Sequence, residues 1–151
     1  MIFAAGLGTR LRPLTDNMPK ALVPVAGKTM LERVILKLKD AGFHDITINI
    51  HHFGSQIIDF LRANQNFGVD IHISDERGEL LDTGGGIKKA RPLLESNEPF
   101  LIHNADILTD VDLNAFYHHH LESNADATLL TNHRKTSRYL LMNQDNRLCG
   151  W

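Results

Sequence analysis

Short apolar runs alternate with stretches of helical periodicity along most of this chain, and this alternation limits the fold more than any other feature. Several runs have the length and composition of buried strands, at residues 2–5, 46–50, 69–73, 100–103 and 127–131. The stretches between them predict helices, at residues 29–41, 54–63, 84–94 and 113–121. Strands and helices that alternate in this way form an open parallel sheet with helices on both faces. The sequence therefore predicts an α/β fold with a mainly parallel, Rossmann-like sheet.

Composition places the chain among ordinary globular proteins. It has 151 residues, of which 42% are hydrophobic and 23% are charged, as expected for one domain with a sizeable core. A formal net charge of -2 without a long basic run argues against nucleic acid or an anionic membrane as a partner. No apolar run approaches the roughly 20 residues of a membrane span, and a single cysteine, Cys149, excludes an intrachain disulfide. We expect a cytoplasmic domain over residues 1–151 with a small ligand.

A loop that contains two glycines follows the first predicted strand. Gly6 and Gly8 let the backbone turn sharply and approach a ligand without hindrance from a Cβ atom. Thr9 adds a hydroxyl group and Arg10 a planar set of donors that suits phosphate oxygens, while Lys20 adds a second cation. This combination predicts a phosphate-binding loop. The residues expected to contact the phosphate-containing ligand there are Ala5, Gly6, Leu7, Gly8, Thr9 and Arg10.

Two common phosphate motifs do not match this loop. A dinucleotide-binding fingerprint requires Gly or Ala where Leu11 stands, and an acidic residue near the end of the second strand, where residues 49–51 are Asn, Ile and His. A Walker A loop requires Gly five positions before the tail formed by residues 27–29, and that position is Leu22. Both motifs are therefore excluded.

The pattern that does match is longer than either motif. Residues 6–15 read Gly-x-Gly-Thr-Arg-Leu-x-Pro-Leu-Thr, and residues 19–31 read Pro-Lys-x-Leu-Val-Pro-Val-x-Gly-Lys-x-Met-Leu. This pattern, continued at residues 81–87 and 103–110, resembles the sugar-1-phosphate nucleotidylyltransferase family over nearly the whole chain. Among subfamilies, residues 83–87 and 49–52 look most like N-acetylmuramate-1-phosphate uridylyltransferases and mannose-1-phosphate guanylyltransferases. The resemblance implies a nucleotide-diphospho-sugar transferase fold, of which this chain would be the N-terminal portion, truncated at its C-terminal end.

The resemblance also implies a reaction, namely transfer of a nucleoside monophosphate from an NTP to a sugar 1-phosphate in NDP-sugar biosynthesis for the cell wall. The attacking phosphate oxygen is already ionised, so the protein must supply cations and backbone donors that hold two polyanions in line. Mg²⁺ is the expected cofactor. UTP is the favoured nucleotide, with GTP or dTTP as alternatives. A nucleotide-binding module without catalysis is the alternative function, because the family's acceptor half would follow Trp151.

Individual roles follow from the same resemblance. Arg10 is expected to bind the β- and γ-phosphates, and Lys20 matches the family's catalytic lysine. Asp106, in a loop after a strand, is expected to hold Mg²⁺. The residues expected to read the base through their main chain are Thr83, Gly84 and Gly85, and those expected on the substrate side are Asn104, Asn49 and His51.

Other polar residues have structural interpretations. Asp110 and Asp112 precede a predicted helix and are expected to cap it. The histidines at 118–120 point in different directions on a helix and cannot bind one ion. For Arg12, a phosphate contact and a solvated role both stay open. Residues 139–142 and 147–151 flank a polar segment and predict a hairpin.

Overall fold

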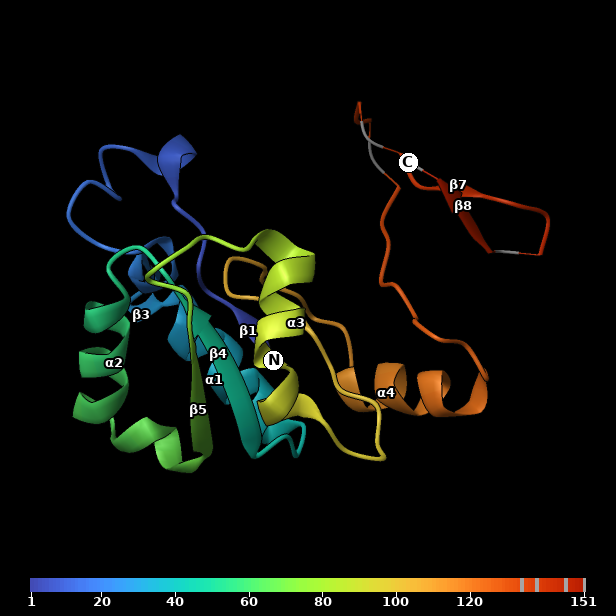
Figure 1. The fold of residues 1–151 in the computed structure, drawn as a ribbon, viewed down its shortest axis with the longest axis horizontal. Helices are drawn as coiled ribbons and strands as arrows, with labels where there is room; N and C mark the ends of the chain where they lie inside the picture. Colours follow the sequence, from blue (N-terminus) through green and yellow to red (C-terminus); the bar gives the residue numbers. More distant parts are fainter. Residues whose placement is uncertain (134, 138, 146, 151) are drawn as a thin grey trace.

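A four-stranded parallel sheet forms the centre of the molecule (Figure 1). The structure, a computed structural model, describes every residue except Arg134, Arg138, Asn146 and Trp151. The strands, in the spatial order β5-β4-β1-β6, are β5 (Asp70–Asp75), β4 (Asp45–Ile50), β1 (Ile2–Phe3) and β6 (His103–Asn104). Ile2 lies beside Ile48 on one side and His103 on the other. The parallel sheet predicted from the sequence is confirmed.

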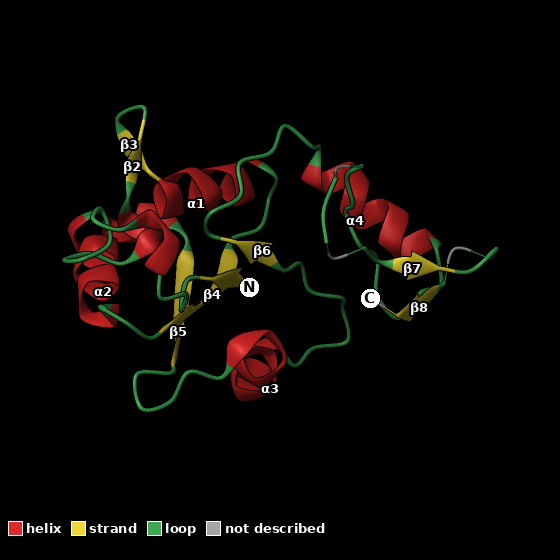
Figure 2. Ribbon diagram, turned by 90° about the horizontal axis from the view of Figure 1, so that it is seen from above, coloured by secondary structure: helices red, strands yellow, loops and turns green. Residues whose placement is uncertain are grey.

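Helices cover both faces of this sheet. Helices α1 (Met30–Asp40) and α2 (Gly54–Ala63) lie on one face, and α3 (Asp82–Leu94) lies on the other (Figure 2). Helix α4 (Leu113–Glu122) lies beyond β6. No helix in the described part of the chain is both long and apolar enough to cross a membrane.

Helix α1 has a capped start, a glycine at its end and an apolar face that follows the predicted helical periodicity. The Thr29 hydroxyl accepts a hydrogen bond from the Glu32 amide at 3.1 Å, which satisfies one unpaired donor of the first turn. Gly42 follows the helix with a φ of +86°, the left-handed conformation that glycine adopts easily. The apolar face between these ends packs on the sheet and consists of Leu31, Val34, Ile35 and Leu38.

Strand β4 is buried on both faces, of which one is apolar and the other is polar. Ile46, Ile48 and Ile50 join the core beneath α1 and α2. Thr47 and Asn49 alternate with them and are buried on the opposite face, which packs against α3. The sheet therefore carries polar side chains on the side that faces α3.

The chain between β1 and α1 is long and holds several short elements. These are the 3₁₀ helices η1 (Thr9–Leu11) and η2 (Lys20–Leu22) and the antiparallel strands β2 (Pro24–Val25) and β3 (Lys28–Thr29). A further 3₁₀ turn, η3 (Gln65–Gly68), leads into β5. The predicted hairpin is present, as β7 (Leu141–Met142) paired with β8 (Leu148–Gly150). It lies apart from the sheet (Figures 1 and 2). Asn146 and Trp151, which belong to the predicted hairpin, lie outside the described residues.

One predicted strand was wrong, and several predicted boundaries differ from the observed ones: for example, β1 ends at Phe3 rather than at residue 5, and β5 ends at Asp75 rather than at residue 73. Residues 127–131 form no strand, and Leu129 and Leu130 are more than half exposed. A strand needs a neighbour for its backbone groups, and β6 is the edge of the described sheet on this side. Helix α3 begins at Asp82 rather than at residue 84, and β6 begins at His103 rather than at residue 100.

Candidate functional site

Most residues that the sequence predicted for the site line one cavity of about 420 Å³ at the carboxyl ends of β1 and β6. The strand order reverses at β1, and open α/β sheets bind their ligands at such a reversal. His51, Gly84 and Gly85, all within the described part of the chain, lie outside the lining. The predicted residues that do line the cavity are Ala5, Gly6, Leu7, Gly8, Thr9, Arg10, Lys20, Asn49, Thr83, Asn104 and Asp106.

Gly8 fixes the shape of the loop after β1. Its φ is +67°, and a Cβ atom built there would lie 2.9 Å from Thr15 Cγ2 and 3.1 Å from Lys20 Cβ. Its carbonyl accepts hydrogen bonds from the Thr15 hydroxyl at 2.8 Å and from the Leu11 amide at 2.9 Å. Gly6 has open space around the same position. Gly8 is therefore the glycine that the fold of this loop requires.

Lys20 and Asp106 meet across the site. Lys20 is the first residue of η2, Asp106 follows β6, and the ammonium and carboxylate groups form an ion pair. Their side chains are 31% and 39% exposed, so both groups remain accessible from the cavity. The structure thus brings the predicted catalytic lysine against the predicted metal ligand.

The two arginines of the loop have different surroundings. Arg10 lines the cavity, whereas Arg12 lies outside the lining and approaches Asp16 at 3.5 Å. The Arg12 and Asp16 side chains are largely exposed, so this pair lies in solvent. The structure favours the solvated role of Arg12.

Two glycines of the run after β5 pack closely at the start of α3, whereas Gly84 has open space around it. A Cβ atom on Gly85 would lie 2.9 Å from Leu81 Cβ, and one on Gly86 would lie 2.9 Å from Glu76 Oε1. Asp82 has a φ of +54°, in the left-handed region, and lines the cavity with Thr83. Reading of a base by Gly84 and Gly85 therefore stays a prediction, whereas Asp82 is a lining residue that the sequence analysis missed.

The predicted substrate side chains are held to different degrees. Asn49 is 2% exposed, and its side chain accepts from the Ala4 amide and donates to Glu76 Oε1, each at 2.8 Å. His51 donates from Nδ1 to the Glu76 carbonyl at 2.6 Å. Asn104 is exposed and lines the cavity. Of these predicted residues, Asn104 has the side chain most available to a ligand.

Asp106 has the chemistry of a ligand for Mg²⁺ that is bound together with a phosphate. In the described residues no three His, Cys, Asp or Glu side chains gather into a metal site. Mg²⁺ commonly takes one or two protein carboxylates and completes its octahedron with water and phosphate oxygens. The Asp106 carboxylate lies at the edge of a cavity that the loop of residues 5–10 also lines, and it fits that requirement.

His103 places a neutral ring beside the site. Burial lowers the pKa of His103, and the nearby Lys37 and the amino terminus act in the same direction. Its Nδ1 donates to the Asn104 carbonyl at 2.8 Å, an interaction that opposes the decrease in pKa. The ring is therefore neutral at pH 7 and adds no positive charge near the phosphate-type loop.

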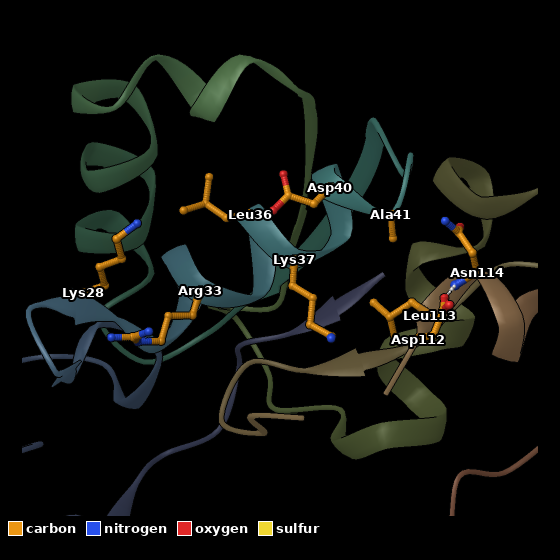
Figure 3. Close-up of a pocket in the computed structure, with 9 residues that line it drawn as sticks. All are labelled: Lys28, Arg33, Leu36, Lys37, Asp40, Ala41, Asp112, Leu113 and Asn114. Atoms are coloured by element: carbon orange, nitrogen blue, oxygen red, sulfur yellow. Dashed lines mark hydrogen bonds between the residues drawn. The ribbon is translucent and has the colours of Figure 1, made fainter. Parts of the chain in front are cut away.

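A second cavity, of about 530 Å³, lies between α1 and the start of α4 (Figure 3). Two of its charged residues, Arg33 and Asp112, already have partners. Arg33 donates to the Val25 and Ala26 carbonyls, and Asp112 accepts from two amides at the start of α4. Of the two predicted caps, Asp112 is therefore confirmed. None of the residues predicted for the site lines this cavity. The larger volume therefore does not make it the better candidate.

Two predictions outside both cavities can also be assessed. His118 and His119 are exposed, and His120 shares a 2.8 Å hydrogen bond with the Thr128 hydroxyl, so the histidine run does not converge. Cys149 is exposed and has a free thiol group.

Comparison with known proteins agrees with this geometry. A family model for nucleotidyl transferases matches residues 1–148. N-acetylmuramate alpha-1-phosphate uridylyltransferase from Neisseria meningitidis serogroup B is 48% identical over 117 residues, which cover 78% of this chain and 50% of that protein. Mannose-1-phosphate guanyltransferase from Yarrowia lipolytica is 34% identical over 142 residues, which cover 92% of this chain and 39% of that protein. The solved structure of HddC from Yersinia pseudotuberculosis complexed with GMP-PN is 31% identical with a TM-score of 0.71, covering 80% of this chain and 53% of that chain. The chain spans half or less of the length of these two curated relatives.

Proposed function

Because the chain belongs to the nucleotidyl transferase family, we propose that its cavity binds a nucleoside triphosphate and that the whole protein transfers the nucleotidyl group to a sugar 1-phosphate. The products are an NDP-sugar and pyrophosphate. The observation that carries this proposal is the Lys20–Asp106 ion pair, which lies at the edge of a cavity lined by the loop after β1. An ammonium group can bind phosphate and a carboxylate can bind the accompanying metal, so this pair supplies both charges that a magnesium nucleotide requires.

In this proposal the loop binds the phosphates that are present before the reaction. Backbone amides of residues 5–10 and the Thr9 hydroxyl donate to phosphate oxygens. Arg10 holds the β- and γ-phosphates with its planar set of donors, where the departing pyrophosphate gains charge. The loop therefore orients the nucleotide and stabilises the leaving group.

Lys20 and Asp106 exchange partners when the nucleotide enters. Lys20 turns from the carboxylate to the α-phosphate or the sugar phosphate and reduces the repulsion between the two substrates. Asp106 would then be free to hold Mg²⁺, which would supply positive charge beside the phosphate oxygens. Asn104, exposed beside Asp106, is placed to contact the sugar. The ion pair is thus the resting state of two groups that act on different partners.

UTP is the nucleotide that the proposal favours. The relative that is 48% identical is named a uridylyltransferase, whereas the relative that is 34% identical is named a guanyltransferase. Thr83 and Asp82 form the wall on which the base would lie. Thermal unfolding with UTP, GTP or dTTP in MgCl₂ tests the choice, because a nucleotide at about 100 times its dissociation constant stabilises the chain by roughly 2.7 kcal/mol. A shift with GTP or dTTP and none with UTP would contradict it.

A nucleotide-binding module is the second candidate function, because the contacts proposed for the loop of residues 5–10 would bind a nucleotide whether or not transfer follows. Calorimetric titration with UTP and exchange of labelled pyrophosphate into UTP from a UDP-sugar, both with Mg²⁺, separate the candidates. Binding with exchange supports the enzyme, and binding without exchange supports the module. A chain that neither binds UTP nor exchanges pyrophosphate would contradict both. A cytoplasmic location, where nucleoside triphosphates are available, belongs to the same proposal.

A further inference from the structure

Glu76 is a completely buried carboxyl group that the proposed reaction does not use. It directly follows β5, its exposed fraction is 0%, and it lies outside the cavity lining. Oε1 accepts from Asn49 Nδ2, while Oε2 has no hydrogen-bond partner among the described residues. A buried carboxyl oxygen without a partner is costly. The position of this residue therefore needs an explanation beyond packing.

Glu76 is connected to both walls of the cavity. Through Asn49 it reaches the amide of Ala4, the residue at which the chain leaves β1 and enters the loop. On its other side, Gly86 lies so close that an added Cβ atom would be 2.9 Å from Glu76 Oε1 and 3.2 Å from Asn49 Nδ2. The wall on the Ala4 side is formed by the loop of residues 5–10, and the wall on the Gly86 side is formed by Asp82 and Thr83 at the start of α3.

The backbone of Glu76 is fixed as firmly as its side chain. Its amide donates to the Ile50 carbonyl at 2.8 Å, and its carbonyl accepts from His51 Nδ1 and from the Glu79 amide. The backbone position from which the Glu76 side chain extends is therefore fixed. The direction of the Asn49 amide is also set, because the Ala4 N–H requires an oxygen and the Glu76 oxygen requires an N–H.

We propose that Glu76 is a positioning residue of the nucleotide site: acting through Asn49, it fixes the start of the loop relative to α3. This inference rests on the proposed function, because the site that it positions is the nucleotide cavity. Glu76 touches no reacting atom. What the site requires from it is an acceptor of fixed position for Asn49.

A matched pair of substitutions tests the need for an acceptor. E76Q keeps an oxygen that accepts from Asn49, whereas E76M keeps a similar length and removes it. We expect UTP with Mg²⁺ to bind E76Q within about threefold of the unsubstituted chain and E76M about tenfold more weakly, since a buried donor is left unpaired. Equal UTP affinity of E76M and the unsubstituted chain, or equal weakening by both substitutions, would overturn the proposal.

A rescue experiment separates positioning from stability. N49D leaves an acceptor for Ala4 but sets two carboxyl groups against each other without a donor between them. Adding E76Q supplies an amide that donates to the new carboxylate, so N49D/E76Q should recover UTP affinity to within about threefold, whereas N49D alone should lose about tenfold or more. A double variant that binds no better than N49D would contradict the proposal.

Thr47 provides the control. It lies on the same face of β4, is 2% exposed, and its hydroxyl has no partner among the described residues. T47V should leave UTP affinity unchanged. A loss of affinity in T47V as large as in E76M would show that any change in this buried layer has the same effect, and would overturn the proposal.

Hydrogen exchange at the Ala4 amide gives a readout that does not depend on nucleotide. It should be slow in the unsubstituted chain, E76Q and T47V, and faster in E76M and N49D. If the unsubstituted chain binds neither UTP nor GTP, the proposed function fails, and Ala4 exchange alone then decides whether Glu76 orders the loop. Unchanged exchange in folded E76M would overturn the positioning role in either case.

Discussion

Gly8 is the loop residue whose replacement the structure tolerates least. A left-handed φ costs a residue with a side chain about 1–2 kcal/mol, and the new methyl group would also press on Thr15. G8A should therefore lower the melting temperature by several degrees, at roughly 2–4 °C per kcal/mol for a chain of this size. G6A is the matched control and should melt close to the unsubstituted chain, because nothing lies near that position. Equal melting temperatures of G8A and G6A would contradict this description of the loop.

Asp106 should control the metal dependence of nucleotide binding. Its ion pair with Lys20 is partly exposed, so D106N should cost less than about 1 kcal/mol of stability. Without metal, D106N should bind UTP more tightly than the unsubstituted chain, because Lys20 is released and a negative charge is removed. Added Mg²⁺ should tighten binding to the unsubstituted chain but not to D106N. Calorimetric titrations in EDTA and in MgCl₂ measure this, and an equal response of both proteins to Mg²⁺ would rule out Asp106 as the ligand.

Substitution of Arg10 and substitution of Lys20 should have different effects on UTP affinity and on the rate of transfer. Arg10 is proposed to hold phosphates that are present in the ground state, so R10M should weaken UTP binding by roughly tenfold to a hundredfold. Lys20 is proposed to stabilise charge during transfer, so K20M should lower the saturated rate by about 100-fold to 1,000-fold while changing UTP affinity much less. Dissociation constants and single-turnover rates in the whole protein decide between these roles. Normal turnover of saturated K20M, together with a loss of affinity as large as in R10M, would leave Lys20 only a binding role.

At the level of elements, helices were easier to predict than strands. The apolar face of α1 and its Thr29 cap are local features of the sequence, and a helix is present where the sequence predicted one, at residues 29–41. Residues 127–131 have the composition of a strand, but a strand also needs a neighbour, and composition does not show whether one is present. The same limit applies to β6, where Phe100 and Ile102 are exposed before pairing begins at His103.

Strand β6 also carries a pH dependence that can be measured. The pKa of buried His103 is lowered in the folded chain, so the unfolded chain binds more protons at acid pH. Its contribution to stability is full above the ordinary histidine pKa and is lost as the pH falls below about 6.5. H103N keeps a donor for the Asn104 carbonyl but cannot titrate. The free energy of unfolding, measured with urea between pH 7 and pH 5, should therefore fall less in H103N.

The buried amino terminus titrates in the same range and is present in both proteins. Burial lowers the pKa of the Met1 amino group to about 6, which gives a slope of the same sign. The difference between H103N and the unsubstituted chain therefore reports the titration of His103 together with its interaction with the amino terminus. Identical slopes would show that His103 does not gain a proton on unfolding.

For the whole molecule, the sequence predicted which residues line one cavity better than how their side chains are held. The order of strands and loops brings residues 5–10, Lys20 and Asp106 to one end of the sheet, whereas His51, also predicted for the site, lies outside the cavity lining. The sequence could not show that Asn49 and His51 are bonded to Glu76, because that contact joins the ends of two different strands. An acidic residue directly after a strand and shortly before a glycine run was the available signal for Glu76. Long-range pairing of this kind depends on the register between β4 and β5.

Amide chemical shifts during titration with UTP and Mg²⁺ test the central claim most directly, because they report which of the two cavities binds the nucleotide. The account predicts shifts at the loop residues 5–10, at Thr83 and at residues 104–106, with no comparable change at Lys37 or Asn114 in the cavity between α1 and α4. Saturating shifts at Lys37 and Asn114 with an unchanged loop, or no shifts in either cavity at millimolar UTP, would contradict it.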